Sequence, residues 1–137
     1  MKKIINICLF TFVSVILLSS CKKKKADPHT PPIMEFKTGA GYTTGDKTVA
    51  KSDTLLVGIT ATKTEDNLKS YNVSFIYDGG STSTTFYNYL LTADEANGYS
   101  KDIKIVARNS AGNEKWIFSV VDRDGNITQK TINLVVN

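Results

Sequence analysis

Residues 54–62 read Thr-Leu-Leu-Val-Gly-Ile-Thr-Ala-Thr, and their pattern decides the fold class. Leu55, Val57, Ile59 and Ala61 occupy alternate positions, and most residues between them are small or polar. Because successive side chains of a strand point to opposite faces, this alternation predicts a strand with one face in a core. No long stretch of the chain shows the 3.6-residue apolar period of an amphipathic helix.

Similar alternation predicts further strands over residues 69–77, 85–91, 102–108, 115–121 and 127–136. Residues 33–36 and 48–49 are weaker candidates for an opening strand, interrupted by the segment Gly39-Ala40-Gly41. Ile127 is out of phase with Ile132, which predicts a bulge between them. About seven strands without a helical layer predict an all-β protein with the architecture of a β-sandwich.

Three connections contain recognisable turn chemistry. Asp78-Gly79-Gly80 and Asp124-Gly125-Asn126 predict tight turns, because glycine tolerates the positive φ that such turns require. Thr92-Ala93-Asp94-Glu95 matches a capping box, and Gly98 follows it. This combination predicts one short helical turn on the loop between two strands.

The N-terminal residues 1–20 are predicted to be a lipoprotein signal peptide. Lys2 and Lys3 precede an apolar run over residues 4–18, which is too short for a spanning helix of about 20 residues. The run ends in Leu18-Ser19-Ser20-Cys21, which resembles the bacterial lipobox. The resemblance implies cleavage before Cys21 and a diacylglycerol anchor on its sulfur, with fatty acyl chains such as palmitate. The alternatives are an uncleaved membrane anchor and an ordinary signal peptide with a chance cysteine.

Residues 21–32 are predicted to be a flexible tether between the lipidated cysteine and a folded domain over residues 33–137. Lys22 to Lys25 repel one another, and all three prolines of the chain lie between Pro28 and Pro32. The lysines either contact anionic headgroups or form a polar spacer. Cys8 leaves with the signal peptide and Cys21 carries lipid, so the folded part has no thiol for a disulfide.

The charge distribution excludes nucleic acid as an expected partner. The chain of 137 residues has a formal net charge of +4. Six of its 17 basic residues and one of its 13 acidic residues precede Pro28, so the rest has a net charge of −1. A nearly neutral domain lacks the basic footprint of a nucleic-acid-binding protein.

The residue types also predict that the domain is not an enzyme. His29 is the only histidine, and no cysteine follows Cys21, which excludes Ser-His-Asp and Cys-His arrangements from the domain. The carboxylates are scattered over strand ends and turns, and their spacing singles out no pair for glycoside hydrolysis.

The C-terminal region resembles a known family. Residues 116–126 read Trp-Ile-Phe-Ser-Val-Val-Asp-Arg-Asp-Gly-Asn and precede a strand ending Ile132-Asn133-Leu134-Val135-Val136. This resembles the last two strands of bacterial immunoglobulin-like domains. The whole of residues 31–137, with its Phe36-Lys37-Thr38-Gly39 opening, is similar to small immunoglobulin-like lipoproteins of Bacteroidetes bacteria.

The resemblance implies an immunoglobulin-like β-sandwich attached by lipid to the bacterial outer membrane. Such domains serve as spacers, adhesion modules and carbohydrate-associated accessories, so fold is implied more firmly than function. The chain departs from the antibody-type core, because it lacks the cysteine pair and the tryptophan of strand C. The basic residues after Cys21, where surface-exported relatives have acidic ones, leave the periplasmic and cell-surface faces both open.

Two groups of side chains are candidate binding sites. Tyr87 and Tyr89 fall on one face of the strand predicted over residues 85–91, with Phe86 and Leu90 on the other. The tyrosines either stack on a sugar ring or cover an edge strand. Separately, the side chains of Asp122, Asp124 and Asn126 alternate in a glycine-containing turn. They either start a calcium loop or close a hairpin, and calcium would need more oxygen ligands than these three supply.

Asp53-Thr54-Leu55 resembles the acceptor for O-glycosylation in exported Bacteroidetes proteins, which implies a glycan on Thr54. Apart from the calcium alternative, no cofactor is expected. Together these features predict a lipid-anchored cell-envelope protein whose non-catalytic domain binds a glycan or a protein. The alternative is a structural or accessory subunit of a larger envelope assembly with no ligand of its own.

Overall fold

The computed structural model describes residues 29–137. The predicted signal peptide, Cys21 and most of the predicted tether lie outside the described residues. Among the described residues, the structure contains no helix with the length and apolar character needed to cross a membrane.

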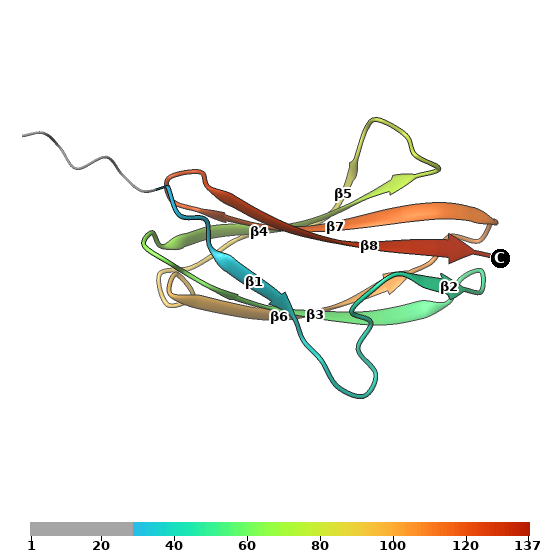
Figure 1. The fold of residues 1–137 in the computed structure, drawn as a ribbon, viewed down its shortest axis with the longest axis horizontal. Coiled ribbons are helices and arrows are strands. Elements are labelled where there is room, and N and C mark those ends of the chain that lie inside the picture. The colour runs from blue at the N-terminus through green and yellow to red at the C-terminus, as the bar shows by residue number, and fades with distance from the viewer. Residues whose placement is uncertain (1–28) are drawn as a thin grey trace, which may run out of the picture.

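Eight strands form the described part of the chain, one more than the sequence pattern predicted. They are β1 (Ile33–Phe36), β2 (Lys47–Val49), β3 (Thr54–Thr62), β4 (Leu68–Tyr77), β5 (Thr84–Leu90), β6 (Gly98–Val106), β7 (Gly112–Asp122) and β8 (Ile127–Val136). One sheet has the order β1-β3-β6, and the other has the order β2-β8-β7-β4-β5. The two sheets lie in two layers (Figure 1), which confirms the predicted β-sandwich.

The core lies between the two sheets and consists of the side chains that the alternation placed inward. Leu55, Val57, Ile59 and Ala61 of β3 are all buried. The facing sheet contributes Trp116, Phe118 and Val120 from β7 and Ile132, Leu134 and Val136 from β8. Trp116 is only 2% exposed. Each large apolar side chain that is fully buried stabilises the fold by roughly 1.5–3 kcal/mol.

The interrupted opening strand predicted over residues 33–36 and 48–49 proves to be two strands, which belong to different sheets. β1 pairs antiparallel with β3, whereas β2 pairs parallel with β8. The segment around Gly39 and Gly41, both with positive φ, allows the chain to leave one sheet and reach the other. In Figure 1 this connection projects below β3.

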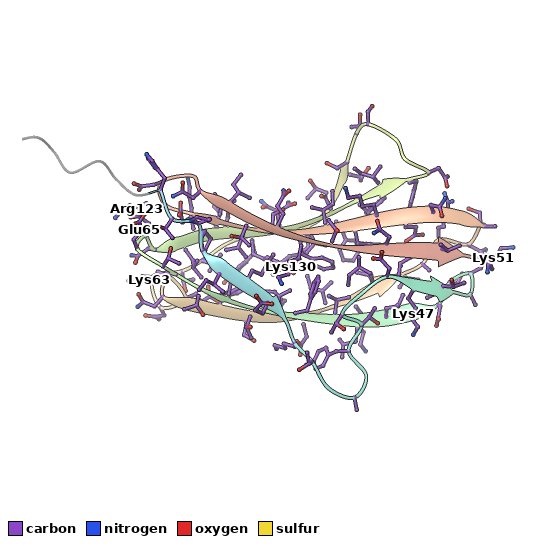
Figure 2. All side chains as sticks on the ribbon, in the orientation of Figure 1. Lys47, Lys51, Lys63, Glu65, Arg123 and Lys130 are labelled. Carbon is purple, nitrogen blue, oxygen red and sulfur yellow. The ribbon has the colours of Figure 1, made fainter. Side chains whose placement is uncertain are left out.

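The long side where β1 approaches β8 is closed by one ion pair and two aromatic rings. The Nζ atom of Lys130 lies 2.7 Å from Oε2 of Glu35 and 5.9 Å from the ring centroid of Phe36. The Phe36 ring packs edge-on against Phe118, with 5.4 Å between centroids. Lys130 lies over the middle of the sandwich, whereas Lys63 and Lys47 lie toward its opposite ends (Figure 2).

The bulge predicted in the last strand is wrong. β7 and β8 pair in one unbroken register from Gly112↔Val136 to Val121↔Ile127. Ile127 is 54% exposed, because it follows the turn at the end of the sheet, where an apolar side chain is tolerated in solvent. The register shifts lie in β4 and β5 instead.

The helical turn predicted after β5 is also wrong, although its capping contact forms. The backbone N–H and the hydroxyl of Thr92 both donate to Oε2 of Glu95, at 2.9 and 3.0 Å. The chain makes only a hydrogen-bonded turn there, and Gly98 begins β6 instead of ending a helix. The connection between β5 and β6 crosses from one sheet to the other within residues 91–97, and only i→i+3 hydrogen bonds form in it.

The two predicted glycine turns are confirmed. Gly79 has a φ of 73° in the turn between β4 and β5, and Gly125 has a φ of 93° in the turn between β7 and β8. Both values lie in the left-handed region that favours glycine.

Candidate functional site

Among the described residues, β5 is an edge strand of the five-stranded sheet and pairs with β4 alone. The surrounding segment, residues 79–93, contains no charged side chain. β6 is likewise an edge strand of the other sheet. The aromatic residues that the sequence singled out therefore lie where the two sheets have unpaired edges.

Four tyrosines, here called the tyrosine cluster, connect these two edges. Tyr71, Tyr87, Tyr89 and Tyr99 come from β4, β5 and β6. The Tyr89 ring stacks on Tyr99 and Tyr87, with centroids 5.7 and 6.4 Å apart. Tyr71 lies 5.6 Å from Tyr99 and 6.0 Å from Tyr87, and the Lys101 ammonium lies 5.5 Å from the Tyr87 centroid.

The surroundings of Tyr71, Tyr89 and Tyr99 raise the pKa of their hydroxyl groups. Burial raises the pKa of Tyr71 and of Tyr99 well above the ordinary value. The Tyr89 hydroxyl donates to Oε2 of Glu95 at 3.1 Å, and this hydrogen bond raises the pKa of Tyr89. The backbone N–H of Thr92 lowers the pKa of Glu95, so the acceptor stays ionised at neutral pH.

The tyrosine cluster joins the predicted pair Tyr87 and Tyr89 to the core. Both rings are partly buried, and each has a second ring or an ammonium group packed against it. This geometry agrees with the alternative in which the pair covers an edge strand. A flat sugar ring could stack on these tyrosines only if the neighbouring groups moved.

A bulge at Phe86 overturns the predicted division of β5 into two faces. Val73 pairs with Tyr87 and Ser74 pairs with Thr85, so Phe86 is the extra residue between them. Its ring reaches Trp116 of the core, edge-on at 5.2 Å, instead of pointing to the opposite face from Tyr87. An inserted residue resets the two-residue period of a strand, and simple alternation cannot anticipate it.

The large apolar side chains exposed near β5 differ from those that the sequence favoured. Phe86 is 46% exposed and Leu90 is 70% exposed. Tyr77, at the end of β4, is also exposed and packs on Phe75 with 4.7 Å between ring centroids. We call Tyr77, Phe86 and Leu90 with the free backbone edge of β5 the β5 surface. The alternating pattern of the sequence singled out Phe86 and Leu90. That Tyr77 belongs to the same surface could be seen only from the tertiary packing.

An ion pair positions the hairpin that carries the β5 surface. The two Nη atoms of Arg108 donate to the two carboxylate oxygens of Asp78 at 2.6 Å each. This pairing lowers the pKa of Asp78 to about 2. The Asp78 carboxylate also accepts the backbone N–H of Asn113, and the Arg108 guanidinium lies 5.0 Å from the Tyr77 ring centroid. The turn between β4 and β5 is thereby fixed to the connection between β6 and β7.

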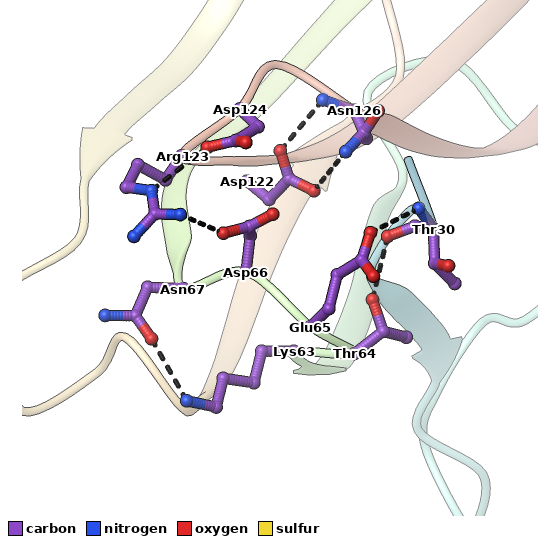
Figure 3. A network of polar contacts seen from close by, with 10 residues as sticks. All are labelled: Thr30, Lys63, Thr64, Glu65, Asp66, Asn67, Asp122, Arg123, Asp124 and Asn126. Atoms are coloured by element: carbon purple, nitrogen blue, oxygen red, sulfur yellow. Dashed lines mark hydrogen bonds and ion pairs between the residues drawn. The ribbon is translucent and has the colours of Figure 1, made fainter. Parts of the chain in front are cut away.

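The residues of the predicted calcium loop form a hairpin closure (Figure 3). The backbone N–H and the side-chain amide of Asn126 donate to the two carboxylate oxygens of Asp122, at 2.8 and 2.9 Å. Asp124 accepts a hydrogen bond from Nε of Arg123 at 3.0 Å, and Asp66 pairs with the same guanidinium. Residues 29–137 contain no group of three or more His, Cys, Asp or Glu side chains that could hold a metal ion.

The neighbouring contacts in Figure 3 attach the start of the described chain to this end of the sandwich. The Thr30 backbone N–H donates to Glu65 at 2.8 Å, and the Thr64 hydroxyl donates to the Thr30 carbonyl at 2.8 Å. The predicted glycan acceptor Thr54 is an exposed residue at the start of β3. The structure does not bring it together with either candidate binding group.

An open groove of about 400 Å³ lies beside the hairpin. Its lining residues come from the turn after β4 and from β7 and β8: Asp78, Gly79, Asn113, Glu114, Lys115, Asn133, Leu134 and Val135. Asn133 is fixed by Asp46, which accepts its backbone N–H and its side-chain amide. The groove lining contains no aromatic side chain, so the β5 surface is the better candidate for a contact with a partner.

The strand order defines the class of fold. β1, β3 and β6 lie in the positions of strands A, B and E of an immunoglobulin sandwich, and β4, β7 and β8 lie in those of C, F and G. β5 extends the second sheet beside β4, as strand C′ does in variable-type domains. The protein is an immunoglobulin-like β-sandwich.

Comparison with solved structures agrees with this class. A chitin binding domain from Burkholderia pseudomallei is similar, with a TM-score of 0.52, 11% identity, and coverage of 69% of this chain and 58% of that chain. Murine CRIg matches with a TM-score of 0.40 and 14% identity over 79% of this chain and 99% of its own. No protein-family model matches the sequence, and no curated protein matches it. At 11% identity, the similarity to the chitin binding domain shows the fold alone.

Proposed function

We propose that this protein is a lipid-anchored, non-catalytic binding module of the bacterial cell envelope. The exposed apolar residues of the β5 surface carry the proposal. Phe86, Leu90 and Tyr77 are three of the seven large apolar side chains that the described residues leave exposed. All three belong to one hairpin, with Phe86 on the core side of β5 and Leu90 on its outer side, and exposed apolar residues beside a free strand edge can mark an interaction site.

The anchor in this proposal is Cys21, and the compartment is the outer membrane. The support is the sequence of residues 1–32, with its apolar run, its Leu18-Ser19-Ser20-Cys21 motif and its charged, proline-rich tether. Acyl chains contribute roughly 0.8 kcal/mol per buried CH₂, so two or three chains hold the protein firmly. Which face of the membrane the domain occupies is left to a protease-accessibility experiment on intact cells.

The ligand in this proposal is a glycan or an envelope protein. The chitin binding domain among the similar structures supports a binding module only through its fold. Aromatic side chains suit both ligand classes, because they stack on sugar rings and anchor protein interfaces. The accessory-subunit alternative uses the same anchor without an independent ligand.

Fatty-acid labelling tests the anchor. Cells given labelled palmitate are expected to label the wild-type protein, whereas Cys21→Ala abolishes the label and leaves an unprocessed precursor. Cys8→Ala is the matched control, since that cysteine lies inside the predicted signal peptide. Unchanged labelling of Cys21→Ala contradicts the anchor.

Binding is tested with full-length protein in detergent, in gels containing envelope polysaccharide and on immobilised envelope proteins. The double variant Phe86→Ala/Leu90→Asp is expected to lose retention at least about ten-fold, which corresponds to about 1.4 kcal/mol. The control Ile33→Ala/Val106→Asp changes exposed apolar residues of the other sheet. Equal loss in both variants, or no retention of the wild type, contradicts the binding surface. Retention only within an assembly, unaffected by the β5 variant, favours the accessory subunit.

A further inference from the structure

The free edges of the two sheets differ in how well they are protected against pairing with another strand. β1 has four residues, includes Glu35 and follows Pro31-Pro32. β2 has only three residues, and β6 carries Lys101, Asp102 and Lys104. Short length, proline, charged side chains and β-bulges are features by which natural sheets block their edges.

β5 lacks the first three of these protective features. It has seven residues, Thr84–Leu90, and contains no proline and no charged residue. Its one irregularity is the bulge at Phe86, beyond which Tyr87 to Leu90 pair regularly with β4. The free side of this stretch therefore offers backbone N–H and C=O groups to another strand.

We propose that β5 binds an extended, uncharged segment of a partner protein, which adds to the five-stranded sheet as a further strand beside β5. This inference rests on the proposed binding function and names the class of its ligand. In such strand addition, main-chain hydrogen bonds supply affinity, and side chains that alternate along the segment supply specificity.

The chemistry of the partner segment follows from what surrounds the edge. Residues 79–93 carry no charge, and the charged side chains that lie against them are engaged within the chain: Lys101 over the Tyr87 ring, Glu95 with Tyr89 and Thr92, and Arg108 with Asp78. Placing an unpaired charge there would remove it from water without compensation, which is unfavourable. Leu90 and Phe86 instead present exposed apolar surface beside the edge. An uncharged segment with aliphatic side chains matches both features.

A second copy of this chain fits less well. An antiparallel β5–β5 pair relates two copies by a two-fold axis, so their strands run in opposite directions. The strand β1, which follows the tether, begins at one end of the sandwich, and the C-terminus lies at the other (Figure 1). The two tethers of such a pair would leave from opposite ends, although both anchors belong to one membrane. A partner from another protein has no such constraint.

Site-directed photo-crosslinking in living cells tests the proposal. The probe is p-benzoylphenylalanine in place of Leu90 in the full-length protein. We expect one main adduct, whose cross-linked peptide is an uncharged segment of another protein. A synthetic copy of that peptide is then expected to slow hydrogen exchange of the β5 amides at least about ten-fold.

A charge placed on the edge provides the decisive comparison. Asn88→Lys adds a lysine to β5 and is expected to abolish the adduct and the exchange protection. Ser100→Lys adds the same charge to β6 and is expected to change neither. Both positions are exposed, and thermal unfolding verifies that both variants fold.

Four outcomes overturn the proposal. They are no adduct at position 90, an adduct of two copies of this chain, an adduct that persists in Asn88→Lys, and a bound peptide that leaves β5 exchange unchanged. If the same probe at Val135 or Val106 instead captures a partner, strand addition at β5 fails, but the proposed binding module remains.

Discussion

Gly58 lies in the middle of β3, beneath a cluster of side chains from other segments. The Nζ atom of Lys37 lies 2.7 Å from Oδ1 of Asp102, and the Tyr42 hydroxyl donates to Oδ2 of the same carboxylate at 3.0 Å. A Cβ atom at position 58 would lie 2.6 Å from the Asp102 carboxylate and 2.7 Å from the Tyr42 ring. The missing side chain therefore allows the connection between β1 and β2 to lie against β3.

Gly58→Ala is expected to destabilise the domain by roughly 1–3 kcal/mol, because the added methyl group overfills this contact. Urea unfolding followed by tryptophan fluorescence measures the change. Gly98→Ala is the matched control, since its Cβ would meet its nearest atom, the Ala61 carbonyl oxygen, at an ordinary 3.6 Å. Equal stability of the two variants would show that the side chains over Gly58 can move aside without lowering the free energy of unfolding.

Glu114 is a second residue whose role only the packing reveals. It is 1% exposed. One carboxylate oxygen accepts the backbone N–H of Arg108 at 2.7 Å, and the other accepts the indole N–H of Trp116 at 2.8 Å. The Glu114 carboxylate thus accepts hydrogen bonds from two N–H groups for which the surrounding apolar side chains offer no acceptor.

Glu114→Ala is expected to lower the free energy of unfolding by roughly 2–4 kcal/mol, since each abandoned donor contributes about 1–3 kcal/mol. Glu114→Gln keeps one carbonyl acceptor and is expected to lose about half as much. Thermal and urea unfolding measure both, with the exposed neighbour Lys115→Ala as control. A Glu114→Ala protein as stable as this control would contradict the role assigned to the carboxylate.

At the scale of elements, the hairpin of β4 and β5 is held in place by contacts outside itself. Asp78 binds Arg108 and Asn113, and Gly112 has a positive φ where the Arg108 guanidinium passes. The sequence Asp78-Gly79-Gly80 predicted the turn, because its residue types have local conformational preferences. It did not predict the ion pair, because the partner comes from a connection 30 residues away.

The Asp78–Arg108 pair predicts a pH dependence of stability. The pKa of Asp78 is lowered from 3.8 to about 2 by the hydrogen bond from Arg108. The folded state therefore binds this proton less readily than the unfolded state does. The ion pair contributes fully to the stability of the folded state above pH 3.8, and this contribution is lost as the pH falls through about 2. Asp78→Asn is expected to be less stable at neutral pH and to lose less stability over this interval. Calorimetry across this pH interval measures the stability of the wild type and of Asp78→Asn. Equal losses of stability in the two proteins would contradict the prediction.

For the whole molecule, the described residues contain a complete core. The buried residues of the core run from Met34 to Val136, and both cysteines of the chain lie outside residues 29–137. The stability of the domain therefore comes from packing between the sheets without a disulfide, which a chain of this size can supply.

A protein limited to residues 29–137 is accordingly expected to unfold in one cooperative transition, with the same midpoint with and without a reducing agent. Circular dichroism and tryptophan fluorescence measured along the same urea titration provide the check. Non-coincident transitions would show that part of the core depends on residues before His29.

The sequence by itself determined the strands, their inward faces and the glycine turns, because these follow from local preferences and from a two-residue period. Tertiary structure alone decided which sheet each strand joins, where β5 bulges, and that Phe86 packs on Trp116 on the same side as Tyr87 and Tyr89. The reason is that a register shift and an edge position depend on neighbouring strands distant in the chain, and a periodic pattern contains no information about such neighbours.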